Sequence, residues 1–125
     1  MFLSRKNLGL HLLRFGLVVV YLYFGFAQLS DPESWSGIVP NWATSISTLD
    51  AVTITYMNAI FEIAFALLLA FGLWTKWVSF FLGIHLAVIT LTLGFSPEGA
   101  RDFGLTLATF AHGFMDDDAK KFPAP

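Results

Sequence analysis

The 125-residue sequence contains no cysteine and few charged residues. Without cysteine the chain forms no disulfide and offers no thiolate for catalysis, for zinc or for an iron–sulfur cluster. Charged residues make up 13% of the chain, whereas a soluble domain has about 25%. The seven Lys and Arg residues are scattered and form no basic face, so we expect no nucleic-acid partner. The chain thus has too few charged residues to cover a water-facing surface.

Several motifs that would identify an activity are also missing. The sequence has no Gly-rich phosphate loop and no nucleophile–base motif. It has no intramembrane row of cations of the kind a voltage sensor needs. Internal duplication is not apparent, which weakens the case for a transporter built from inverted repeats. These absences leave an activity, if there is one, to side chains scattered over several helices.

Long apolar stretches dominate the sequence, which is 56% hydrophobic. About 20 helical residues cross the roughly 30 Å hydrocarbon core of a bilayer. The sequence predicts an all-α, four-transmembrane-helix bundle in one domain, residues 1–115, followed by a polar cytoplasmic tail, residues 116–125. The expected helices cover residues 9–29, 54–74, 77–95 and 100–115, of which the last is short for a span. We expect a multi-pass protein of the cytoplasmic (inner) membrane, in contact with lipids and either with other membrane subunits or with further copies of itself.

The basic residues predict how the chain lies in the membrane. With four spans, five of them fall on one side and only Arg101 falls on the other: Arg5, Lys6, Lys76, Lys120 and Lys121. The excess of Lys and Arg marks the cytoplasmic side, so the N- and C-termini are expected there. The first extracytoplasmic loop, residues 30–52, has no Lys or Arg but contains Trp35 and Trp42. Tryptophans favour the headgroup level, which predicts an interfacial segment.

Glu62 lies in the middle of the second expected helix, and the rest of the chain has to accommodate it. A carboxylate there costs roughly 2.5–3.5 kcal/mol on insertion scales and therefore normally faces the protein interior. Asn58 is one turn away on the same face. At about 1.5 Å per residue, Tyr21, His85 and His112 come from the other helices at similar depth. We therefore predict a polar cluster near the midplane, with Glu62 and His85 as the catalytic pair.

Further candidate ligand-binding residues complete this hypothesis. Tyr21, Asn58 and His112 belong to the midplane cluster, and a second layer lies nearer the outer face: Gln28, Arg101 and Asp102. The alternative is that these polar groups only hydrogen-bond the helices together. His85 and His112 could ligate haem b, but four short helices leave little volume for it. Glu62 with both histidines gives a minimal ligand set, so no metal site and no intrinsic cofactor are expected.

The motifs resemble, in their order and spacing, those of the DoxX/DoxD-like family of small membrane proteins. Helix one has Arg14 and then Gly25–Leu29, similar to the family's Arg…Gly-x-x-Lys-Leu pattern, with Gln28 where the family often has Lys. Further likenesses lie in three places: Gly37-Ile38-Val39-Pro40, the run from Glu62 to LLLAFGLWTK, and Arg101-Asp102-Phe103-Gly104. The resemblance covers residues 9–115 and implies a four-helix membrane bundle.

In function the resemblance implies an association with thiosulfate:quinone oxidoreductase and other membrane redox complexes. We therefore expect a small membrane subunit of a redox or respiratory-type complex, whose polar pocket accepts a quinone or another hydrophobic ligand. If the chain takes part in catalysis, it does so as a subunit of a quinone-linked oxidoreductase. Two alternatives stay open: a non-catalytic structural or assembly subunit, and a small-molecule carrier.

Overall fold

The computed structural model describes the backbone of residues 5–121 and the side chains of residues 5–115, and every regular element within this range is helical. The fold consists of four long helices: α1 (Arg5–Ser30), α4 (Ala51–Ala70), α5 (Thr75–Leu93) and α6 (Pro97–Lys121). Two short helices, α2 (Pro32–Ser36) and α3 (Asn41–Ser47), lie between α1 and α4. The predicted all-α class is confirmed.

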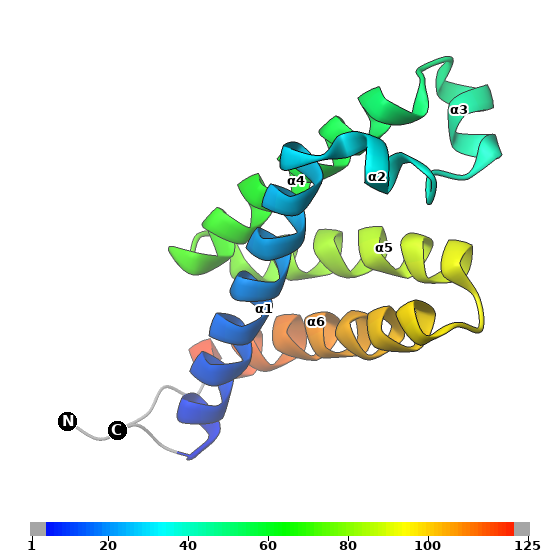
Figure 1. Cartoon of the computed structure of the whole chain (residues 1–125). Helices are drawn as coiled ribbons and strands as arrows, with labels where there is room; N and C mark the ends of the chain where they lie inside the picture. The colour runs from blue at the N-terminus through cyan, green and yellow to red at the C-terminus, as the bar shows by residue number, and fades with distance from the viewer. Residues whose placement is uncertain (1–4, 122–125) are drawn as a thin grey trace.

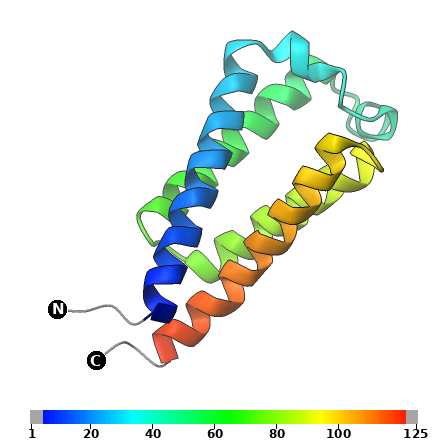
Figure 2. The same ribbon diagram turned by 60° about the horizontal axis from the view of Figure 1, so that its bottom comes forward.

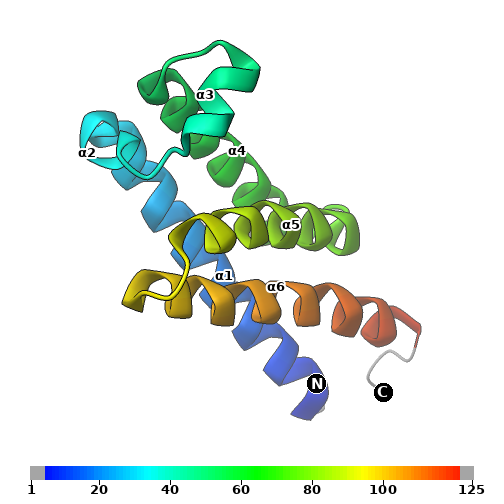
Figure 3. The same ribbon diagram turned by 90° about the vertical axis from the view of Figure 1, so that its right-hand side faces the viewer.

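The long helices form two antiparallel pairs, α1 with α4 and α5 with α6 (Figure 1). The two pairs cross each other, as Figure 3 shows for α1 against α5 and α6. Helix α1 begins and α6 ends at one end of the molecule, which also holds the α4–α5 turn (Figure 2). We call this the terminal end. The opposite end, which we call the α3 end, holds α2, α3 and the α5–α6 turn.

Local hydrogen bonds explain why α4 and α6 begin earlier than their apolar patterns predict. The Asp50 carboxylate accepts the backbone N–H of Thr53 at 2.8 Å and caps α4. The Ser96 hydroxyl likewise accepts the backbone N–H of Gly99 at 2.9 Å, with Pro97 in the first position of α6. Because polar residues and a proline form the starts of these two helices, the apolar pattern alone did not predict those starts.

The end of α6 differs from the prediction. The apolar pattern stops at Met115, and residues 116–125 were expected to form a polar tail. In the structure α6 continues to Lys121, a stretch that contains Ala and Lys, which are strong helix formers. Residues 122–125 of the predicted tail lie outside the described residues.

Between residues 5 and 121, three helices are long and apolar enough to cross a membrane: α1, α4 and α5. Helix α6 has 25 residues but is not apolar enough to qualify by composition. A fourth span over residues 100–115 and a cytoplasmic location for both termini therefore stay predictions.

Each pair is packed through small residues on the facing sides of its helices. A Cβ on Gly25 of α1 would lie 2.5 Å from Ile63 of α4, and a Cβ on Gly83 of α5 would lie 2.8 Å from the Phe110 ring of α6. Close approach through glycine is how membrane helices gain contact area, since lipid provides no hydrophobic driving force between them.

The inward faces of α1 and α4 follow helical spacing. On α1 the buried residues include Val18, Tyr21, Gly25 and Gln28, at steps of three, four and three residues. The buried stripe of α4 repeats at alternate steps of four and three residues: Thr55, Ala59, Glu62, Ala66 and Leu69. Glu62 is 6% exposed, so the acid faces the protein interior, as its cost in lipid requires.

Candidate functional site

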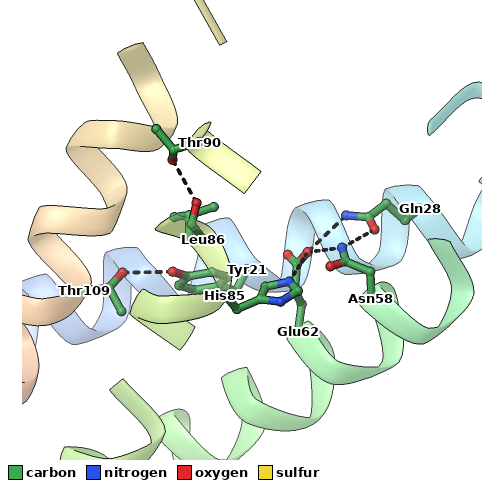
Figure 4. A network of polar contacts seen from close by, with 8 residues as sticks. All are labelled: Tyr21, Gln28, Asn58, Glu62, His85, Leu86, Thr90 and Thr109. Carbon is green, nitrogen blue, oxygen red and sulfur yellow. Dashed lines mark hydrogen bonds and ion pairs between the residues drawn. The ribbon is translucent and has the colours of Figure 1, made fainter. Parts of the chain in front are cut away.

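Three polar side chains from α1 and α4 form a closed hydrogen-bonded triangle (Figure 4). The Asn58 amide nitrogen donates to Glu62 Oε1 at 2.6 Å and to Gln28 Oε1 at 2.7 Å. The Gln28 amide nitrogen donates to the same Glu62 oxygen at 3.2 Å. Glu62 Oε1 thus accepts two amide donors, which replace the water that the carboxylate loses on burial. Gln28, predicted to lie in an outer layer, is a direct partner of the acid.

His85 of α5 joins this triangle from the other helix pair. Its Nε2 lies 3.9 Å from Glu62 Oε1, and its side chain is 25% exposed. The imidazole ring also packs on Phe61, with ring centroids 4.6 Å apart. Nε2 is buried and makes no hydrogen bond within the described structure. An approach of about 1 Å would bring the two groups to hydrogen-bonding distance, so a proton can pass between them after a small rotation.

A cavity of about 280 Å³, which we call the main pocket, opens on His85 at the α3 end. Five polar residues line it: Gln28, Thr55, Asn58, His85 and Thr92. Its other walls are mainly apolar and come from the α2–α3 segment, α4 and α5, and they include Trp35, Ile38, Val39, Pro40, Trp42, Ile54, Val88 and Ile89. A mainly apolar cavity with a few convergent polar groups is the usual form of a small-molecule site. The motif at residues 37–40 therefore contributes pocket wall.

Glu62 opens instead on a second cavity of about 160 Å³, which we call the inner pocket. Tyr21, Arg101 and Asp102 also line it, and Gln28 and Asn58 line both pockets. The hydrogen bond between Gln28 and Asn58 thus lies between the two cavities. Because Glu62 does not line the main pocket, a ligand there meets His85 and reaches the acid through it.

The remaining predicted residues of the inner pocket hold the two helix pairs together. The Tyr21 hydroxyl lies 2.9 Å from Thr109 Oγ1 of α6. Arg101 Nε lies 2.9 Å from Asp102 Oδ1, and the guanidinium covers the Phe24 ring of α1 at 4.8 Å. Asp102 is buried, whereas Arg101 is about half exposed. The contacts of Tyr21 with Thr109 and of Arg101 with Phe24 join α6 to α1, and the Arg101–Asp102 ion pair lies in the first turns of α6.

His112 lies apart from the other residues of the predicted midplane cluster. It is fully buried between α5 and α6, where its Nδ1 lies 2.7 Å from the Ser79 hydroxyl. It lines neither the main nor the inner pocket. It lies opposite Ser79, six residues before His85 on α5, so the depth estimate placed it too close to His85 along the helix pair. Among the described residues, no three His, Asp or Glu side chains gather as metal ligands.

Sequence reasoning missed the hydroxyl partners on α5 and α6. Thr109 bonds Tyr21, Ser79 bonds His112, and Thr90 and Thr106 lie 3.3 Å apart across the pair. Hydroxyl side chains are common in membrane helices, where they can satisfy their own backbone. The available signal was the helical spacing of Thr106, Thr109 and Gly113, three small residues on one face of α6.

The comparison with protein families gives one match. The model of the DoxX family matches residues 9–94, a range that holds Gln28, Asn58, Glu62 and His85. Helix α6, with the expected likeness at Arg101–Gly104, lies beyond the matched range. A search of curated proteins and a search of solved structures found no match to this chain.

Proposed function

This chain belongs to the DoxX family and is an integral membrane protein, and we propose that its main pocket binds a quinone-type molecule. The observation that carries the proposal is the main pocket itself: a mainly apolar cavity with Asn58, Gln28 and His85 on its lining. A quinone has a flat apolar ring and carbonyl oxygens that need a hydrogen-bond donor. The apolar walls suit the ring, and the imidazole of His85 suits a carbonyl oxygen.

In this proposal His85 is the residue that touches the ligand and exchanges a proton with it. Glu62 is the proton partner behind it, since Oε1 faces Nε2 at 3.9 Å. Gln28 and Asn58 hold the carboxylate in place through the hydrogen-bonded triangle. Electrons for the quinone come, in this proposal, from another subunit of a membrane redox complex.

We further propose that the protein lies in the cytoplasmic membrane with the terminal end facing the cytoplasm. Arg5 and Lys6 lie at the start of α1 and Lys76 lies at the start of α5, both at the terminal end, whereas the segment from residue 30 to 52 at the α3 end lacks Lys and Arg. The main pocket then opens near the outer leaflet.

Quinone binding is tested with purified protein in lipid nanodiscs and a decyl-tailed benzoquinone. Quinones quench tryptophan fluorescence, and Trp35 and Trp42 line the main pocket. We expect saturable quenching, which is lost when both are replaced by Phe while Trp74 and Trp77, near the terminal end, remain. His85→Leu should weaken binding about tenfold, or about 1.4 kcal/mol. The matched control is His11→Leu on the exposed start of α1.

Quenching that never saturates, or a His85→Leu variant that binds like the parent, contradicts the proposal. In an isolated redox complex, Glu62→Gln should also lower quinone-linked turnover, because the amide no longer takes a proton. Unchanged turnover removes the role of Glu62 and favours a structural subunit.

A further inference from the structure

A third cavity, which we call the side groove, adjoins the main pocket between α3 and α4. The side groove has a volume of about 380 Å³ and shares five lining residues with the main pocket: Trp42, Ala43, Ile54, Asn58 and His85. Beyond these, its apolar lining is Ile46, Leu49, Met57 and Phe61. His85 therefore stands where the two cavities join, and a molecule bound beside it has room in both.

The rim of the side groove is apolar and faces outward. Ile46 is 78% exposed, and Trp42, one turn earlier on the same face of α3, is 54% exposed. Met57, across the groove on α4, is 55% exposed. Residues 34–49 contain no charged side chain. A short uncharged helix with Trp and Ile on its outer face is typical of a segment at the lipid interface, so the groove opens toward acyl chains.

The sizes of the main pocket and the side groove suit a ligand with a ring-shaped head and an apolar tail. Small-molecule sites measure about 300–1,000 Å³, and the main pocket, at about 280 Å³, holds a single ring but not a ring with a long chain. Apart from Asn58 and His85, which it shares with the main pocket, the side groove is lined only by apolar residues and Ser47. An extended hydrocarbon chain leaving the ring therefore has one apolar path past His85.

We propose that the ligand carries an apolar tail, and that this tail lies in the side groove and leaves the protein between α3 and α4 into the lipid. This inference rests on the proposed function and adds the ligand class: a ring-sized head with a lipid-dissolved chain. The same opening is the route by which the ligand enters, from the bilayer and not from water. Trp42 and Met57 form the two sides of this route.

The test compares a decyl-tailed benzoquinone with the same ring lacking the tail, each titrated by calorimetry into protein in nanodiscs. Met57→Trp fills the groove and should weaken the tailed probe at least tenfold while changing the tail-less probe less than twofold. Ile60→Trp is the matched control, because Ile60 is on the same helix, is 59% exposed and lines neither cavity. It should leave both probes unchanged.

The outcomes separate the two proposals. If both probes bind and Met57→Trp weakens them equally or not at all, the side groove does not hold the tail, although the quinone site stands. If neither probe binds the parent protein, the quinone site itself is refuted and the groove proposal falls with it.

A second measurement does not depend on the folding of Met57→Trp. A variant that keeps Trp42 as its single tryptophan, with Phe at positions 35, 74 and 77, is placed in nanodiscs with lipids brominated on their acyl chains. Strong quenching by the brominated lipid and little by aqueous iodide supports a groove that faces the bilayer. The opposite pattern overturns it, because the rim would then lie in water.

Discussion

The contact between Tyr21 and Thr109 makes a sharp prediction, because its two partners are not equivalent. The Thr109 hydroxyl donates its only proton to the Leu105 carbonyl oxygen at 2.7 Å. It therefore accepts from Tyr21, whose hydroxyl lies 2.9 Å away. Tyr21 is 2% exposed and depends on this acceptor, whereas Thr109 keeps a hydrogen bond without Tyr21. Removing one partner should not cost the same as removing the other.

Thr109→Val keeps the shape of the side chain but leaves the buried tyrosine hydroxyl unpaired, which costs about 1–3 kcal/mol. Tyr21→Phe removes only one hydrogen bond within the membrane, which is worth about 0.6 kcal/mol on average. In the double variant both sites are apolar, so its stability should lie close to that of Tyr21→Phe. The second substitution should thus restore part of the stability lost by the first.

The assay is reversible unfolding in mixed micelles by increasing detergent denaturant, followed by tryptophan fluorescence. Free energies of unfolding of the parent, the two single variants and the double variant form one cycle. The reasoning is refuted if Tyr21→Phe costs as much as Thr109→Val, or if the two losses simply add.

Two further predictions concern the first turns of α6 and α4. A Cβ on Gly99 would collide with the carbonyl oxygen of Gly94, whereas a Cβ on Gly104 meets nothing within 4 Å. In the same unfolding assay, Gly99→Ala should therefore destabilise the protein by about 1–3 kcal/mol, and Gly104→Ala should stabilise it by about 0.5–1 kcal/mol. Equal effects of the two substitutions would contradict the collision. Hydrogen bonds from the side chain and backbone N–H of Thr53 lower the pKa of Asp50 in the folded protein. The cap of α4 is therefore fully formed above the ordinary pKa of aspartate and is lost as the pH falls through the lower pKa of the folded state. Amide exchange at the start of α4 should accelerate only in that acidic range, and Asp50→Asn should remove most of this pH dependence.

The sequence predicted those parts of the molecule that depend on spacing along one helix. The burial of Glu62 followed from the cost of a charge in lipid. The pairing of Asn58 with Glu62 followed from their separation by one turn, and the structure confirms it at 2.6 Å. Such features need no knowledge of how the helices are arranged.

Features that depend on the rotation and register of one helix against another were not predictable in the same way. His85 and His112 have similar expected depths, yet His85 lies beside Glu62, whereas His112 lies opposite Ser79, six residues earlier on α5. The two-pair arrangement decides this, because α5 and α6 pack on each other along their length. Likewise Gln28, expected in an outer layer, contacts Glu62 because α1 and α4 are close neighbours.

The separation of Glu62 from the main pocket also needed the structure. From the sequence, the acid and His85 were expected to face one cavity. In the fold, Gln28 and Asn58 line both pockets, whereas His85 lines the main pocket and Glu62 lines the inner one. The hydrogen bond between these two amide side chains, at 2.7 Å, lies between the two pockets. An estimate of depth along each helix does not show such a division.

The central claim is that a quinone ring binds in the main pocket next to His85. The most direct test is photolabelling in nanodiscs with an azido-quinone, followed by mass spectrometry of the labelled peptides, with an excess of unlabelled quinone as competitor. We expect competed adducts within residues 35–43, 54–58 and 85–92, the segments that line the main pocket. Adducts confined to the groove around residues 94–103 at the α5–α6 turn, or adducts that the competitor does not displace, would contradict the claim.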